Sequence, residues 1–114
     1  LNLHVAELNG CGYCISAHVG LARGTGMTPE EVAAARSGTG TNPRENALLA
    51  LARRVVRTGG GGARGELARA RAAGVDDAEI FDALAAIALM TFTNAAAQIG
   101  HTEVDFPRAE NLPI

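Results

Sequence analysis

Cys11, Cys14 and His18 are the residues of this sequence whose types and spacing are best suited to chemistry. The two cysteines of the chain lie three positions apart, and the histidine follows the second cysteine by four positions. On a helix, residues three and four apart share a face, so the three side chains would point into one cleft. Asn9-Gly10 is a strong breaker pair, and it predicts that Cys11 lies at or near the first helical position.

This arrangement favours thiol redox chemistry. Free backbone N–H groups and the helix dipole stabilise a thiolate, the reactive form of cysteine, at the first turn. His18 could accept a thiol proton or stabilise the thiolate once it has formed. When one cysteine has been oxidised to a sulfenic acid, the other can attack it and close a disulfide, which protects the sulfur from over-oxidation. We therefore predict a thiol peroxidase or a dithiol oxidoreductase.

Three other interpretations of these residues stay open. The cysteines could be small buried hydrophobic residues. Together with His18 they could bind Zn²⁺, although a closed structural site needs a fourth ligand. His4 and His101 are not obviously placed to supply that ligand, and we expect both at ordinary surface or capping positions. Finally, His18 could be a hydrogen-bonded core histidine without a chemical role.

The elements that must position these residues are predicted to be helices throughout, because no convincing period-two run occurs. We expect the end of a helix over residues 1–8 and a second helix over about 11–23. Capping signals (TPEE at 28–31, NPRE at 42–45) predict helices that end near residue 36 and at the glycine run 59–62.

Two more helices are expected, over about residues 64–73 and from the start signal at Asp76 to about residue 99. The core stripe of the last helix is predicted to contain Ile80, Leu84, Ile87 and Met90 or Thr91. The tail from residue 105 carries two prolines and is predicted to be an extended arm. The fold class is therefore all-α, with about six helices in one domain over residues 1–114 and the cysteine pair at the N-terminus of a core helix.

The composition bears on the core of the protein and on its possible partners. Hydrophobic residues make up 47% of the 114 residues but aromatic residues only 4%, so an alanine-rich core is expected and subunit contacts could complete its burial. Ten basic residues, all arginine, are spread along a chain of net charge −2, and nothing argues for binding to nucleic acid. The apolar region 80–90 contains Asp82 and suits a core helix better than a membrane span.

The two cysteines and the absence of a secretory signal favour a cytoplasmic protein. The apolar start without an initiator Met leaves open that further helices precede Leu1.

Residues 6–18, AELNGCGYCISAH, resemble the core motif of the alkylhydroperoxidase D-like (AhpD-like) proteins of the carboxymuconolactone decarboxylase superfamily. The resemblance extends over nearly the whole chain, through TPEE at 28–31, NALLA at 46–50, TFTN at 91–94 and TEVDFP at 102–107. The last two segments are similar to the C-terminal pattern of a peroxidase-related subgroup. The resemblance implies an all-helical homo-oligomer that reduces organic hydroperoxides without haem, flavin or metal.

The resemblance also implies a role for each candidate residue. Cys14 would attack the peroxide, Cys11 would resolve the product, and His18 would belong to the proton relay. An external thiol would reduce the disulfide: a lipoylated or thioredoxin-like protein, or a small thiol. The family relay includes a glutamate that would fall just upstream of Leu1. Glu7 is the nearest acid, and we expect it to be a solvated side chain at the end of a helix.

Two alternative functions remain open at this point. One is an enzyme like the carboxymuconolactone decarboxylases, although true members of that branch do not depend on a redox dithiol. The other is an oligomeric binding or metal-sensing module that has kept the fold and lost the relay.

Overall fold

The computed structural model describes residues 1–113, which form six α-helices and contain no strand. The helices are α1 (Asn2–Leu8), α2 (Gly12–Gly24), α3 (Pro29–Ser37), α4 (Pro43–Thr58), α5 (Arg64–Ala72) and α6 (Asp77–Ile99). The predicted all-α class is confirmed, and each helix begins and ends within a residue or two of its predicted bounds.

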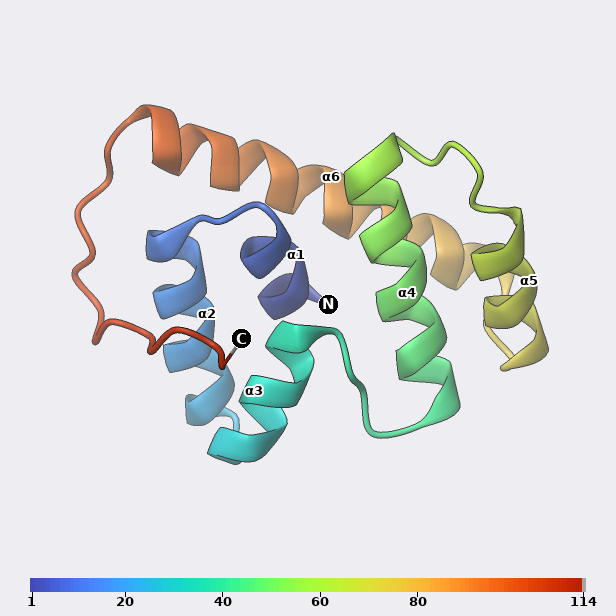
Figure 1. The fold of residues 1–114 in the computed structure, drawn as a ribbon, viewed down its shortest axis with the longest axis horizontal. Helices are drawn as coiled ribbons and strands as arrows, with labels where there is room; N and C mark the ends of the chain where they lie inside the picture. Colours follow the sequence, from blue (N-terminus) through green and yellow to red (C-terminus); the bar gives the residue numbers. More distant parts are fainter. Residues whose placement is uncertain (114) are drawn as a thin grey trace.

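The short helix α1 lies at the centre of the fold, with α2, α3, α4 and α6 packed around it (Figure 1). Its residues Leu3, Val5 and Ala6 are buried. An isolated helix of seven residues is not stable in water, so α1 depends on this packing. It therefore links the elements that surround the cysteine pair.

The predicted start signals form, but not all in the same way. The Thr28 hydroxyl accepts a hydrogen bond from the Glu31 N–H at 3.1 Å, and the Glu31 carboxylate accepts one from the Thr28 N–H at 2.8 Å. This is a complete capping box. Asn42 caps α4 by accepting from the Glu45 N–H at 2.9 Å, but the Glu45 carboxylate turns to the N–H and hydroxyl of Thr41 instead.

The longest helix, α6, is buried on one side only. The buried residues are Ile80, Ala83, Ile87, Met90 and Asn94. Of the predicted core stripe, Leu84 is half-buried and Thr91 is exposed. The opposite side of α6 exposes Phe81, Leu89, Phe92 and Ile99.

By length and composition alone, α6 is apolar enough to cross a membrane. The apolar region considered in the sequence ended at Met90. Residues without charge continue from there to the end of the helix.

The C-terminal tail packs along α2, which it crosses in Figure 1. The Phe106 ring contacts the Tyr13 ring edge-on, with 5.9 Å between their centroids. The Ala109 N–H donates a hydrogen bond to the Ser16 hydroxyl at 3.0 Å. The tail is extended, as predicted, and it covers one face of the helix that carries the cysteines.

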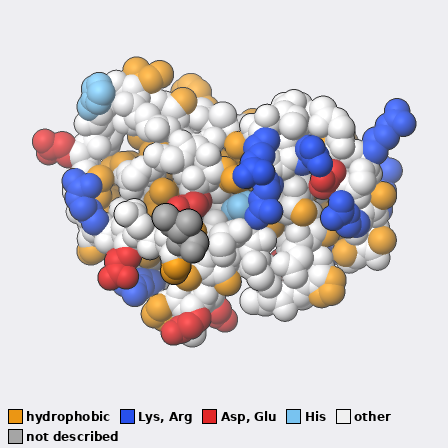
Figure 2. Space-filling view, in the orientation of Figure 1, with side chains coloured by type: hydrophobic (Ala, Val, Ile, Leu, Met, Phe, Trp, Pro, Cys, Tyr) orange, Lys and Arg blue, Asp and Glu red, His pale blue; other side chains and the backbone are white. Residues whose placement is uncertain are grey.

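The fold brings together arginines that are spread along the sequence. Arg53, Arg54, Arg57 and Arg69 line one hollow with Glu66, and Figure 2 shows basic side chains gathered over the region of α4 and α5. Arg54 forms an ion pair with Glu66 at 3.0 Å. The arginines, which are spread along the sequence, are therefore gathered on the surface of the fold.

Arg36 is a buried charge, 7% exposed, and it connects three segments. Its Nε donates to the Glu7 carboxylate of α1 at 2.9 Å, and its Nη1 donates to the Glu110 carbonyl of the tail at 2.8 Å. Its own carbonyl accepts a hydrogen bond from His4 Nδ1 at 2.9 Å. A single arginine of α3 thus holds both α1 and the tail.

Replacing Arg36 by Met should lower the free energy of unfolding by about 2–4 kcal/mol, because Glu7 would keep a largely buried charge without a partner. The matched control is Arg71→Met, which breaks the exposed ion pair with Asp77 and should cost at most about 0.5 kcal/mol. Chemical denaturation followed by circular dichroism measures both. Equal losses for the two variants would contradict the anchoring role of Arg36.

Candidate active site

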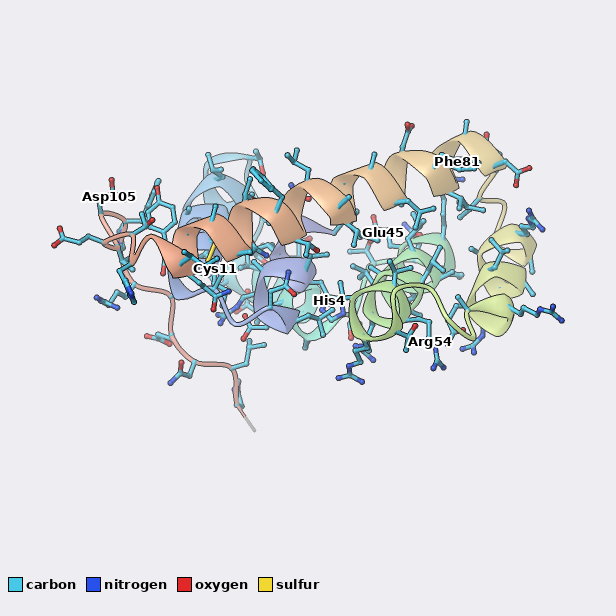
Figure 3. All side chains as sticks on the ribbon, turned by 90° about the horizontal axis from the view of Figure 1, so that it is seen from above. His4, Cys11, Glu45, Arg54, Phe81 and Asp105 are labelled. Atoms are coloured by element: carbon cyan, nitrogen blue, oxygen red, sulfur yellow. A yellow bond between two sulfur atoms is a disulfide. The ribbon has the colours of Figure 1, made fainter. Side chains whose placement is uncertain are left out.

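Cys11 and Cys14 are joined by a disulfide at the start of α2, and the bond is drawn in yellow in Figure 3. Cys11 is the N-cap residue, with φ −85° and ψ 94°, so it lies one position before the first helical residue. Its sulfur accepts a hydrogen bond from the Cys14 N–H at 3.3 Å. Gly10 makes the preceding turn at φ 66°, a left-handed conformation that favours glycine.

The N-terminus of α2 favours negative charge on this sulfur. Backbone N–H groups of the first turn have no partner within the helix, and the helix dipole is positive at this end. When the disulfide is opened, the Cys11 thiolate would keep the Cys14 N–H as a donor. These features lower the pKa of a thiol in general.

Both cysteines lie in the hydrophobic core, as the buried-hydrophobe interpretation expects. Cys11 is 1% exposed and Cys14 is 6% exposed. They pack in one cluster with Val5 and Ala6 of α1, Ala52 of α4, and Ile87 and Met90 of α6. In Figure 3 the labelled Cys11 lies by the C-terminal half of α6. The disulfide nonetheless shows that the two sulfurs are close enough to react with each other.

His18 follows Cys14 by one helical turn on the same helix. It lines a hollow of about 480 Å³ with Leu1, Asn2, Leu3, Leu21, Ala22 and Thr25. Burial, and secondarily the amino group of Leu1, lower the pKa of His18 below its ordinary value of 6.5. The ring is therefore neutral at pH 7 and able to accept a proton. Within residues 1–113 it makes no hydrogen bond to either sulfur.

The expected surface or capping position is wrong for His4, which is 2% exposed in the middle of α1. Its Nδ1 donates to the Arg36 carbonyl, and its Nε2 has no partner among the described residues. Burial lowers the pKa of His4, against the raising effect of the Arg36 carbonyl. His101 is exposed two positions after the end of α6, with φ 49°, as expected of a residue near a helix end.

The expectation of a solvated Glu7 is also wrong, because its carboxylate is paired with Arg36 and its side chain is only 27% exposed. Asn94 is a polar core residue that our residue-by-residue reasoning missed. It is 1% exposed, and neither polar atom of its side chain has a partner in the described part of the chain. Its only signal in the sequence was its place in the segment TFTN.

Gln98, one turn after Asn94, donates to the Asn9 carbonyl at 3.2 Å and ties α6 to the turn before Cys11. Metal binding finds no support in this geometry. Across residues 1–113, no three or more His, Cys, Asp or Glu side chains are grouped so that they could hold a metal ion.

Residues 1–54 match the carboxymuconolactone decarboxylase family. The match covers 54 of the 114 residues. It includes α1, α2, α3 and most of α4, and hence Cys11, Cys14 and His18. The family contains both AhpD-like enzymes and decarboxylases. No curated protein matches the sequence.

Proposed function

We propose that this protein is a thiol-dependent peroxidase or dithiol oxidoreductase that reduces organic hydroperoxides through Cys11 and Cys14. The observation that carries the proposal is the disulfide between these residues at the start of α2. A pair that forms a disulfide within one helical turn can store two electrons and release them without a metal or an organic cofactor. A decarboxylase of the same family has no need of such a pair.

The proposed cycle has two steps. The Cys14 thiolate attacks the outer peroxide oxygen, the O–O bond breaks, and the alcohol leaves after taking up a proton. Cys14 is then a sulfenic acid. The Cys11 thiolate attacks this sulfur, water leaves with one further proton, and the disulfide forms. The peroxide has been reduced to alcohol and water, and the two thiols have been oxidised.

The unequal surroundings of the two sulfurs support this division of roles. Cys14 has the larger exposed fraction, 6% against 1%, which favours it as the atom that meets peroxide and external thiols. The Cys11 sulfur accepts the Cys14 N–H, which favours it as a thiolate that attacks the sulfenic acid. The same hydrogen bond makes Cys11 the better leaving group when an external thiol attacks Cys14.

His18 is proposed as the group that accepts the Cys14 proton, directly or through one water molecule. Its lowered pKa keeps it unprotonated near neutral pH, and it lines a hollow large enough for small molecules. We further propose a cytoplasmic location, where a lipoylated or thioredoxin-like protein, or a small thiol, returns the disulfide to the dithiol.

Reduced wild-type protein treated with one equivalent of tert-butyl hydroperoxide should lose both thiols, and dithiothreitol should restore them. Cys14→Ser should keep its remaining thiol, because the attacking sulfur is gone, whereas Cys11→Ser should lose one thiol. A thiol titration under denaturing conditions measures the loss. Two persistent thiols in the wild type would overturn the proposal and favour a non-catalytic binding module.

His18→Gln should slow the loss of thiols by about 10²–10⁴-fold, the usual contribution of a general base. Because the pKa of His18 lies below 6.5, protonation should remove the base as the pH falls below that value. The wild-type rate should therefore drop further between pH 6.5 and 5 than the rate of His18→Gln. The control is the exposed His101→Gln. A His18 variant with the wild-type rate and pH profile would exclude this role.

A further inference from the structure

We propose that a hollow between α4 and α5 binds a small molecule that carries two or more phosphate groups. The hollow has a volume of about 280 Å³. We call it the arginine hollow, and its polar lining consists of Arg53, Arg54, Arg57, Thr58, Glu66 and Arg69. In Figure 3 the labelled Arg54 lies well away from the labelled Cys11 along the molecule. The inference therefore does not rest on the proposed function.

Positive charge in the arginine hollow exceeds negative charge. Glu66 is the one acidic residue of the lining, and four arginines surround it. Arg54 already neutralises this carboxylate, because its Nε and Nη2 donate to Glu66 Oε1 at 3.2 and 3.0 Å. The other three arginines of the lining form no ion pair within residues 1–113. The whole chain has a net charge of −2, so this surplus is a local property of the hollow.

Two arginines of the hollow are held in place, and two are free to close on a ligand. Arg54 is fixed by Glu66, and Arg53 Nη2 donates to the Ser37 carbonyl at 3.0 Å. The side chains of Arg57 and Arg69 make no hydrogen bond to any described residue, and both are exposed. A site with part of its donors already in place loses less conformational entropy when it binds a ligand.

The surplus of positive charge is unfavourable for the protein alone. Arg53 and Arg57 lie one turn apart on α4, and like charges at this spacing destabilise a helix. The charge also reaches the core: burial is the main cause of the lowered pKa of His4, and the charges of Arg53 and Arg57 lower it further. An anion bound in the hollow would offset both effects.

The chemistry of the lining favours phosphate groups. A guanidinium group is a planar fork that binds two oxygens of one phosphate, and it keeps its charge at any physiological pH. Guanidinium groups from two helices can engage more oxygen atoms than a single phosphate presents. The arginines lie around one hollow on two neighbouring helices and form no long basic stripe, which a strand of nucleic acid would need. A small phosphorylated molecule is therefore the favoured ligand.

Isothermal titration calorimetry with pyrophosphate at low ionic strength should give a dissociation constant of about 1 mM or lower. The double variant Arg57→Gln/Arg69→Gln should raise this constant at least about tenfold, because it removes the two free guanidinium groups. Arg64→Gln is the matched control, since it changes an exposed arginine of α5 outside the hollow, and it should bind as the wild type does. Absence of pyrophosphate binding at millimolar concentration, or wild-type affinity in the double variant, would overturn the proposal.

The folded state is checked on the same samples. The double variant should keep the helical circular dichroism signal and the melting temperature of the wild type, because neither side chain has a partner to lose. Pyrophosphate should raise the melting temperature of the wild type and of Arg64→Gln, and leave that of the double variant unchanged. An equal rise in all three proteins would place pyrophosphate elsewhere and contradict the site.

Three further probes identify the class of ligand. ADP that binds as pyrophosphate does would assign the affinity to the phosphate groups alone, and tighter binding of ADP would extend the site to a nucleotide; both results support the proposal. Citrate that binds as tightly as pyrophosphate would show that the hollow recognises charge and not phosphate. A short single-stranded oligonucleotide that binds more tightly than pyrophosphate would assign the arginines to nucleic acid. Either of the last two results would overturn the proposal.

Discussion

The candidate site depends on the conformation of Cys11 as the residue that caps α2. Its extended backbone turns the sulfur towards the Cys14 N–H, and this single geometry brings the second sulfur within bonding distance. Gly10 makes the turn that precedes it, and the Cys11 N–H donates to the Ala6 carbonyl at 3.2 Å. The redox pair is thus fixed by the end of one helix and the start of the next.

The short central helix α1 takes part in an apolar cluster with the cysteines and in a polar network with Arg36. Its apolar residues Val5 and Ala6 belong to the buried cluster that contains both cysteines, and Glu7 and His4 bind Arg36 of α3. Arg36 also holds the tail, which in turn covers α2 through Phe106 and Ala109. A polar network and an apolar cluster therefore meet on the same seven-residue helix.

The bounds of the helices could be predicted because their signals are local. Capping residues and glycines act within a few positions of the helix end, and the spacing of Cys11, Cys14 and His18 requires only one helix. The same spacing predicted that Cys11 and Cys14 can form a disulfide. The sequence did not exclude that the two cysteines bind a metal or are simply buried. The structure places both in the core and joins them.

The positions of His4 and Glu7 could not be predicted from local patterns. Their partner Arg36 lies far along the chain, and both residues owe their burial to helices that pack around α1 later in the sequence. The cluster of arginines on α4 and α5 could not be predicted for the same reason, because it forms only when the two helices pack together. The exposed apolar residues of α6 could not be predicted for another reason: apolar residues occur on both sides of this helix, so periodicity does not tell which side faces the core.

The central claim is that Cys14 is the sulfur that peroxide oxidises and Cys11 is the sulfur that resolves it. The most direct test is to trap the sulfenic acid with dimedone in Cys11→Ser and to locate the adduct by mass spectrometry. We expect an adduct on Cys14 after treatment with an organic hydroperoxide, and only traces in wild type, where Cys11 closes the disulfide first. An adduct on Cys11 in Cys14→Ser, with none on Cys14 in Cys11→Ser, would contradict the account.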